Sequence, residues 1–314
     1  MALIIKPKKI SKGSTIGIVA PSGPPDRERL KKGIRFLKDR GFAVKVFDQV
    51  KKRIGYLSGD DKSRAGAVNA AFADDKIDAI FCARGGYGSL RILPYIDFEI
   101  IRANPKIIAG YSDITVLLLS IYSQTGLVTF HGPMPAVEFG RSLKPYTIDY
   151  FFKSMLESRP IGKIIKPEGY TIFRIASGKA EGRIVGGNLC LMAKLIGTGH
   201  LPSFKNKIVF FEDTEEEPYR IDGYLCQLFQ STDFAHADGY IIGEFTRTKS
   251  KYGRSAGWTV KQVILDYFSA LGKPCIYGFP CGHGREKITI PIGVRVSLDA
   301  DSKTVAFEET GVRG

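Results

Sequence analysis

The sequence predicts an α/β fold whose N-terminal part is a mostly parallel, buried β-sheet with flanking helices. Two observations support this prediction. Short apolar runs of strand length alternate with segments of helical periodicity along residues 1–130, and glycine or proline follows several of these runs. Alternation of this kind is typical of βαβ units, whose strands are covered by helices on both faces of the sheet.

Five strands and three helices are expected in this part. The first helix, over 26–40, is indicated by Leu30, Ile34 and Leu37 at helical spacing and by Gly41 as a stop signal. The other helices are expected over 62–73 and 113–123, and the strands over 16–20, 43–47, 79–83, 106–109 and 128–130. Ligands of parallel sheets bind beyond the carboxyl ends of the strands. We therefore expect a site in the segments that follow three of these strands, at 21–25, 84–89 and 110–113.

The second half of the chain is expected to form a connector and a C-terminal domain. Periodicity weakens between 139 and 178, where prolines interrupt it around one helix expected near 150–156. The prediction is an N-terminal domain over 1–140, a connector over 141–178 and a C-terminal domain over 179–314. In the last of these, strands are expected over 183–185, 208–211 and 240–242, helices over 189–196, 219–229 and 259–271, and a β-hairpin over 288–307.

Composition limits the class of protein. Of the 314 residues, 44% are hydrophobic and 25% charged, as in ordinary globular domains, and no apolar run suggests a signal peptide or a membrane partner. The five cysteines include no CxxC pair, which favours a reducing, cytoplasmic location over a disulfide framework or a zinc site. The net charge of +14 favours anionic ligands. Because the basic residues are scattered and no nucleic-acid motif accompanies them, nucleic acid is not expected as the main partner.

A serine lies at the turn between the fourth strand and the helix that follows it, in the motif Gly110-Tyr111-Ser112-Asp113. A serine at such a turn presents its hydroxyl above the sheet edge, where N–H groups of the helix N-terminus meet a developing oxyanion. The arrangement resembles a hydrolase nucleophile elbow, although Ile114 replaces the second glycine of GxSxG. The alternative is that Ser112 only caps the helix.

A glycine-rich loop, Arg84-Gly85-Gly86-Tyr87-Gly88, follows the third strand. Three glycines in four residues allow backbone N–H groups to approach a ligand closely, so this loop is a candidate for the second donor of an oxyanion hole. A phosphate-binding loop is the competing interpretation, but neither GxGxxG nor GxxxxGK[ST] is present.

Of the four histidines, His283 is the preferred base, because it lies in a glycine-flanked loop after a strand. His131, at the end of the fifth strand, is the main rival, with a packed, hydrogen-bonded core residue as its alternative. A base also needs a carboxylate that holds its tautomer. Glu212 emerges at the end of an apolar strand, but 215–217 follow as further glutamates, and spacing alone does not choose among these carboxylates.

Together these motifs resemble the LD-carboxypeptidases, or muramoyltetrapeptide carboxypeptidases, over nearly the full length of the chain. The matching stretches are IGIVAPSGP, RGGYGSLRILPYID, IAGYSDIT, HGPM, GGNLCLMAKLIGT, FFEDTEEEPYRID and GHG. The resemblance implies a parallel α/β domain followed by a smaller β-rich domain, with the site at their junction. It also implies a triad of Ser112, Glu212 and His283, and an oxyanion hole from the N–H groups of Gly86 and Asp113.

The resemblance further implies a cytoplasmic homodimer that needs no metal ion or other cofactor. The expected reaction releases terminal D-alanine from a peptidoglycan tetrapeptide or muropeptide, by cutting its bond to the L-centre of a diamino acid during cell-wall recycling. Arg84 is a candidate for holding the terminal carboxylate, with a structural salt bridge as the alternative. Asn188, at an expected helix start, is a candidate either for substrate binding or for capping that helix.

Two other functions stay open. The microcin C self-immunity proteins resemble the same family and use a similar triad, but they cleave acyl-linked nucleotide toxins and need an aromatic clamp for the base. Trp258, the single tryptophan, lies in a glycine- and lysine-rich loop and is the candidate for such a clamp. A non-catalytic binder of wall peptides is the other alternative, and the joint presence of Ser112, Glu212 and His283 argues against it.

Overall fold

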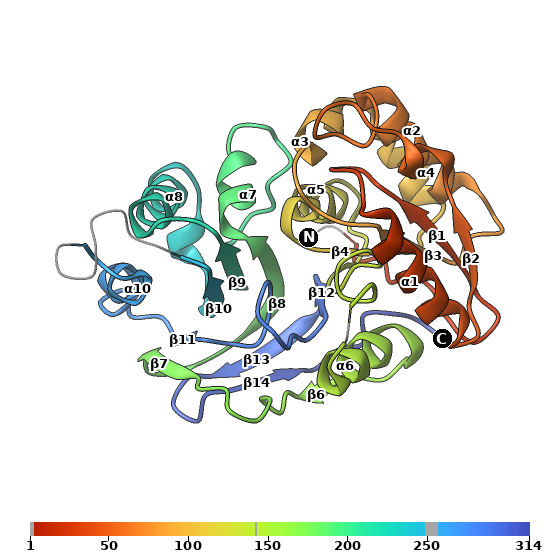
Figure 1. The fold of residues 1–314 in the computed structure, drawn as a ribbon. Helices are drawn as coiled ribbons and strands as arrows, with labels where there is room; N and C mark the ends of the chain where they lie inside the picture. Colours follow the sequence, from red (N-terminus) through yellow and green to blue (C-terminus); the bar gives the residue numbers. More distant parts are fainter. Residues whose placement is uncertain (1–2, 142, 249–256) are drawn as a thin grey trace.

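Two β-sheets organise the chain (Figure 1). The structure is a computed structural model that describes residues 3–141, 143–248 and 257–314. Within these residues, the first sheet has six strands in the order β12-β5-β4-β3-β1-β2. Five of them are parallel: β1 (Thr15–Val19), β2 (Ala43–Val46), β3 (Ala79–Cys82), β4 (Ile107–Gly110) and β5 (Thr129–His131). The strands predicted for the N-terminal part and their parallel pairing are confirmed.

Helices pack against this sheet, and several begin at side-chain caps. α1 (Arg27–Lys38) and α2 (Asp61–Ala73) follow Asp26 and Asp60, whose carboxylates accept hydrogen bonds from N–H groups of the first turn. α3 (Ser89–Ile92) and α4 (Phe98–Ala103) follow β3. α5 (Thr115–Thr125) is buried over most of its length, because it contacts β5 of the first sheet and β8 of the second.

The second sheet has eight strands within the described ranges, in the order β6-β14-β13-β8-β9-β10-β11-β7. Its parallel strands are β8 (Lys179–Asn188), β9 (Lys207–Thr214), β10 (Gly239–Thr246) and β11 (Cys275–Tyr277). Its antiparallel strands are β6 (Gly162–Lys163), β7 (Phe173–Ala176), β13 (Arg295–Asp299) and β14 (Thr304–Phe307). The other described α-helices are α6 (Pro145–Leu156), α7 (Leu189–Lys194), α8 (Pro218–Ser231) and α10 (Val260–Phe268). The predicted fold class, a mostly parallel N-terminal sheet with helices and a second sheet in the C-terminal part, is confirmed.

Strands from three segments pair across the divisions expected from the sequence. β12 (Ile290–Ile292) lies antiparallel beside β5, so a late segment of the chain completes the N-terminal sheet. β6 and β7, from the expected connector, join the second sheet. The hairpin prediction is right for β13 and β14 but wrong for 288–294. Alternating apolar residues identify a strand there, but they do not identify its partner, because a buried strand shows the same pattern in either sheet.

The two sheets meet where the end of β8 passes the start of α5. A Cβ on Gly187, which has a φ of 156°, would lie 2.5 Å from Cγ2 of Thr115, so glycine is needed for this approach. The next residue, Asn188, donates its backbone N–H to Oγ1 of Thr115 at 3.0 Å. This contact brings the ends of β8 and β9 close to the turn that holds Ser112.

Candidate active site

Ser112 lies between β4 and α5, in a short 3-10 turn over Ser112–Ile114. Its φ of 65° places a non-glycine residue in the left-handed region, which costs about 1–3 kcal/mol and is common at functional turns. Gly85 makes room for the side chain, because a Cβ at Gly85 would lie 2.9 Å from Cβ and 3.1 Å from Oγ of Ser112. The Ser112 hydroxyl caps neither the turn nor α5. The capping alternative is therefore wrong, and Ser112 lines a cavity instead.

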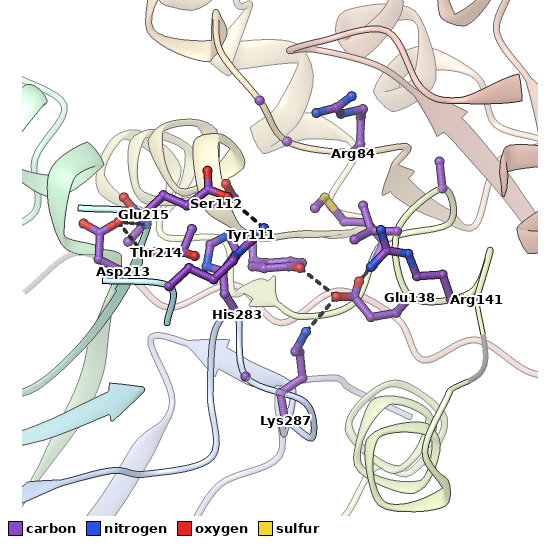
Figure 2. A pocket seen from close by; sticks show the side chains of 18 of the residues that line it. Arg84, Tyr111, Ser112, Glu138, Arg141, Asp213, Thr214, Glu215, His283 and Lys287 are labelled. Atoms are coloured by element: carbon purple, nitrogen blue, oxygen red, sulfur yellow. Dashed lines mark hydrogen bonds and ion pairs between the residues drawn. The ribbon is translucent and has the colours of Figure 1, made fainter. Parts of the chain in front are cut away.

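The cavity has a volume of about 670 Å³ and lies between the two sheets (Figure 2). One wall is the glycine loop after β3, and another is formed by the ends of β8 and β9. The loop after β11 contributes His283 to the same cavity, and the segment 134–147 closes a further side. Ser112 and His283, which are 171 positions apart in the printed sequence, therefore line one space.

His283 and Glu212 form a buried pair. Nδ1 of His283 lies 2.7 Å from Oε2 of Glu212, which is fully buried at the end of β9. Burial opposes ionisation of Glu212, but the charge of His283 and its hydrogen bond outweigh burial and hold the pKa of Glu212 below its usual value. Gly282 is required beside the pair, because a Cβ there would lie 2.2 Å from Oε2 of Glu212. The pair leaves Nε2 of His283 as the ring nitrogen for the cavity side.

The two expected oxyanion donors are Gly86, in the glycine loop, and Asp113, the residue after Ser112. Gly86 is exposed, lines the cavity with a φ of 119°, and its N–H donates to no described residue. Asp113 directly follows Ser112, and its buried carboxylate accepts hydrogen bonds from Oγ of Ser22 at 2.6 Å and from the N–H of Ser89 at 2.8 Å. These bonds tie the serine turn to the loops after β1 and β3. They hold in place the backbone from which an oxyanion would receive hydrogen bonds.

The two substrate-binding candidates differ in how the protein already uses them. Arg84 lines the cavity, donates from Nη1 to the carbonyl of Pro24 at 3.3 Å, and forms no ion pair with a described carboxylate. The salt-bridge alternative is thus not found for Arg84. Asn188 also lines the cavity, but its Oδ1 accepts from the N–H of Leu191 and its Nδ2 donates to Asp213 at 2.8 Å. Its amide therefore caps α7, as the alternative interpretation expected.

His131 is a core residue outside the lining of the cavity. It is 1% exposed, and its ring packs against Phe210 and Tyr111 at centroid distances of 5.2 and 5.8 Å. Burial lowers the pKa of His131 to about 4, so the ring is neutral near pH 7. The alternative interpretation, a packed core histidine, is confirmed. The hydrogen bond expected for such a histidine is not found, because neither ring nitrogen of His131 has a partner among the described residues.

Two further carboxyl groups near Glu212 resist ionisation. Burial, followed by the charge of Glu212, raises the pKa of Asp213 to about 7, against hydrogen bonds from the Cys190 N–H and the Asn188 side chain. Burial also raises the pKa of Glu244 to about 7. A Cβ on Gly284 would lie 1.6 Å from Oε2 of Glu244, so this carboxyl group packs directly against the loop that carries His283.

Comparison with known families decides the classification. Residues 16–132 match the model of the LD-carboxypeptidase N-terminal domain, and residues 181–298 match that of the LD-carboxypeptidase C-terminal domain. The chain belongs to the LD-carboxypeptidase family. The two matched regions contain Ser112 and Glu212 with His283, respectively. Membership of this family identifies the protein as a peptidase.

Relatives whose names state an activity align with nearly the whole chain. A probable murein peptide carboxypeptidase of Bacillus subtilis is 37% identical over 308 residues, covering 98% of this chain and 95% of the relative. The murein tetrapeptide carboxypeptidase of Pseudomonas aeruginosa is 28% identical, with 91% and 93% covered. The microcin C7 self-immunity protein MccF of Escherichia coli is 31% identical, with 95% and 94% covered. The solved structure of MccF in complex with glutamyl sulfamoyl guanosine has a TM-score of 0.91 at 28% identity, covering 98% of this chain and 99% of MccF.

Three residues at the site of this LD-carboxypeptidase family member were not predicted as functional: Tyr111, Glu138 and Lys287. The Tyr111 ring packs edge-on to the His283 ring at 4.8 Å, and its hydroxyl donates to Oε1 of Glu138 at 2.6 Å. Nζ of Lys287 lies 2.7 Å from the same oxygen (Figure 2). Burial opposes ionisation of Glu138, but Lys287 outweighs it and lowers the pKa of Glu138. Tyr111 belongs to the GYSD motif, whereas Glu138 and Lys287 belong to no motif that spacing reveals.

Two further observations concern ligands and membranes. Across 3–141, 143–248 and 257–314, no group of three or more His, Cys, Asp or Glu side chains is arranged to hold a metal ion. In the same ranges, the helices are too short or too polar to cross a lipid bilayer.

Proposed function

We propose that the protein is a serine carboxypeptidase that releases terminal D-alanine from murein-derived tetrapeptides by hydrolysing the bond between the L-centre of a diamino acid and D-alanine. The observation that carries the proposal is the His283–Glu212 pair, which shares a cavity with a strained serine at the end of a parallel strand. The names of the Bacillus and Pseudomonas relatives support murein peptides as the substrate class.

The proposed mechanism gives each member of the triad one role. Glu212 holds the Nδ1–H tautomer of His283, which leaves Nε2 free to accept the proton of Ser112 Oγ. The alkoxide attacks the scissile carbonyl, and the N–H groups of Gly86 and Asp113 stabilise the oxyanion. His283 then protonates the amine of the leaving D-alanine, and water hydrolyses the acyl-enzyme by the same proton transfers in reverse.

Arg84 is the proposed anchor for the terminal carboxylate. Arg84 lines the cavity without a carboxylate partner, and it is the first residue of the glycine loop that would supply an oxyanion donor. A planar guanidinium binds a carboxylate through two parallel hydrogen bonds, which fixes the orientation of the last residue as well as its charge. We further propose that the protein is a homodimer and that it acts in the cytoplasm during cell-wall recycling.

A second candidate function is favoured by the close structural match to MccF, whose solved complex contains glutamyl sulfamoyl guanosine. Under this alternative, the cavity would accept an acyl-linked nucleotide, with an aromatic side chain clamping the base. Trp258, the expected clamp, is 53% exposed and is not among the residues that line the cavity. The preceding residues 249–256 lie outside the described ranges. Murein peptide is therefore the preferred substrate class.

The test is mass spectrometry of defined peptides after incubation with the protein. A tetrapeptide ending in L-diamino acid–D-alanine should lose D-alanine. Amidating its terminus or replacing the last residue by L-alanine should lower kcat/KM by about 30-fold or more, because a charged hydrogen bond is lost or the scissile carbonyl is misplaced. Equal kcat/KM values for the three peptides would refute a carboxypeptidase. Faster cleavage of an aspartyl or glutamyl sulfamoyl nucleoside than of the tetrapeptide would favour the MccF-like alternative.

A further inference from the structure

The cavity has an uneven distribution of charge. Among its described lining residues, the cations without an ion-pair partner are Arg29, Arg84, Arg141, Lys144, Lys194 and Arg285. The two lining cations that have a carboxylate partner are Lys287, which pairs with Glu138, and Arg247, which pairs with Glu215. The unpaired positive charges therefore outnumber the paired ones.

The acidic residues of the same cavity are satisfied within the protein. Asp26 accepts the N–H of Arg29 as the cap of α1, and Glu216 lies near Arg220 and accepts the Tyr224 hydroxyl. Asp213 is held by hydrogen bonds and has its pKa raised to about 7 by burial and by Glu212. These hydrogen bonds do not cancel the carboxylate charges, but none of the described acidic residues of the cavity forms an ion pair with the six unpaired cations. A ligand that carries negative charge would pair with these cations.

Four of the unpaired cations, Arg29, Arg141, Lys144 and Arg285, line the part of the cavity that is formed by α1, the segment 134–147 and the loop after β11. The acidic lining residues of these segments are Asp26, which caps α1, and Glu138, which pairs with Lys287. Figure 2 shows Arg84 and Arg141 on one side of Ser112 and His283, with Asp213 and Glu215 on the other.

Backbone packing explains why these four cations share one part of the cavity. A Cβ on Gly140 would lie 2.8 Å from Cβ of Arg29, so α1 abuts the segment that carries Arg141. The N–H of Lys287 donates to Oγ1 of Thr147 at 3.0 Å, which brings the loop that carries Arg285 against the first turn of α6 beside Lys144.

We propose that Arg29, Arg141, Lys144 and Arg285 form a subsite for a carboxylate within the substrate, distinct from the terminal carboxylate assigned to Arg84. This inference rests on the proposed function, because it concerns the peptide that would be cut. Like charges that line one cavity repel each other and attract a ligand of opposite sign, and their field guides such a ligand to the site. The preferred substrate is then a peptide with at least two free carboxylates, and amidation of the internal one is selected against.

Binding to the Ser112→Ala protein tests the subsite without requiring turnover. The probes are two murein tetrapeptides that both end in free D-alanine and differ only in one internal carboxylate, which is free in one and a primary amide in the other. By calorimetry at low salt, the amide should bind about 10- to 150-fold more weakly, since a charged hydrogen bond contributes about 1.5–3 kcal/mol. Raising the salt concentration should weaken binding of the free-acid peptide more than binding of the amide peptide.

Variants in the Ser112→Ala background locate the effect. Arg141→Gln and, separately, Lys144→Gln should weaken binding of the acid peptide and change the affinity for the amide peptide by no more than about twofold. The ratio of the two affinities should therefore shrink. Arg35→Gln is the matched control, because Arg35 lies on the same helix as Arg29 but not in the cavity. It should retain full discrimination.

The outcomes separate this inference from the proposed function. Equal affinities for acid and amide, no measurable binding of either peptide, or unchanged discrimination in both variants would overturn the subsite, even if the wild-type protein releases D-alanine. Discrimination that is lost in the variants, together with no release of D-alanine by the wild-type protein, would keep the subsite and refute the proposed function.

Discussion

Oε2 of Glu212 lies 2.7 Å from Nδ1 of His283, although 70 residues separate them along the chain. Glu212 has no exposed surface, and the side chain of His283 is 10% exposed at the cavity. A buried carboxylate with a lowered pKa stays ionised and stabilises the imidazolium that forms when His283 accepts a proton. This relationship is the basis of the catalytic predictions that follow.

Replacing Ser112 with alanine should leave a folded protein with kcat reduced by about four orders of magnitude or more, because covalent catalysis loses its attacking atom. Release of D-alanine measured by mass spectrometry, with circular dichroism as a check of folding, gives the result. Ser123→Ala, on α5 after the turn that holds Ser112 but outside the cavity, is the matched control and should stay near wild-type activity. Near-wild-type turnover by Ser112→Ala would reject the triad, and would leave a non-catalytic or differently catalysed function open.

Alanine substitutions of His283 and His131 should have different effects on kcat and on stability. His283→Ala should reduce kcat about as much as Ser112→Ala, since nucleophile and base act as a unit. His131→Ala should mainly reduce stability, because it leaves a space in a packed core, and should retain measurable kcat. Steady-state kinetics alongside thermal unfolding separates the two effects. A greater loss of kcat in His131→Ala would show that the base is wrongly assigned.

Glu244 should make stability depend on pH. Its folded pKa of about 7 lies above the usual value of 4.5, so the folded state binds more protons than the unfolded state between these values. Stability from this group is present below about pH 4.5 and is lost as pH rises to about 7. Glu244→Gln should therefore raise the melting temperature more at pH 8 than at pH 4.5. The difference corresponds to about 1–2 kcal/mol in the free energy of unfolding, after allowance for the partial exposure of Glu244. The same shift at both pH values would contradict the prediction.

Lys287 should contribute to the stability of the folded protein through its ion pair with Glu138. Lys287→Met leaves Glu138 buried without its cation, and loss of one member of a buried pair costs about 3–5 kcal/mol. Urea unfolding measures this loss. The double variant Glu138→Gln with Lys287→Met should recover much of the stability, because no uncompensated charge remains. If the double variant is as unstable as the sum of the single variants, the pair is not coupled as its 2.7 Å separation suggests.

Activity should survive excess chelator. The sequence has no HExxH motif, and the proposed mechanism uses side-chain and backbone groups alone. Turnover of the tetrapeptide after dialysis against EDTA should match that of the untreated protein within error. A large loss that zinc restores would contradict a serine mechanism.

Several residues of the candidate site could be predicted from local sequence patterns, because ligand-binding and catalytic residues of parallel sheets commonly follow the strands. Ser112 and Gly86 lie directly after buried strands, where βαβ topology places ligand-binding loops. The choice of Glu212 among neighbouring glutamates came from family resemblance, since spacing did not distinguish them. The His283 contact agrees with that choice, while the catalytic roles themselves stay predictions.

The sequence by itself determined the α/β class, the positions of the first five strands along the chain and the serine turn, because apolar periodicity and turn residues act over a few neighbouring positions. Only the tertiary structure decided which strand completes the first sheet, that Asn188 caps a helix, and that Tyr111, Glu138 and Lys287 form one buried network beside His283. These features depend on contacts between distant segments. The side chains concerned leave no periodic signal, because burial and pairing arise only when the two sheets pack together.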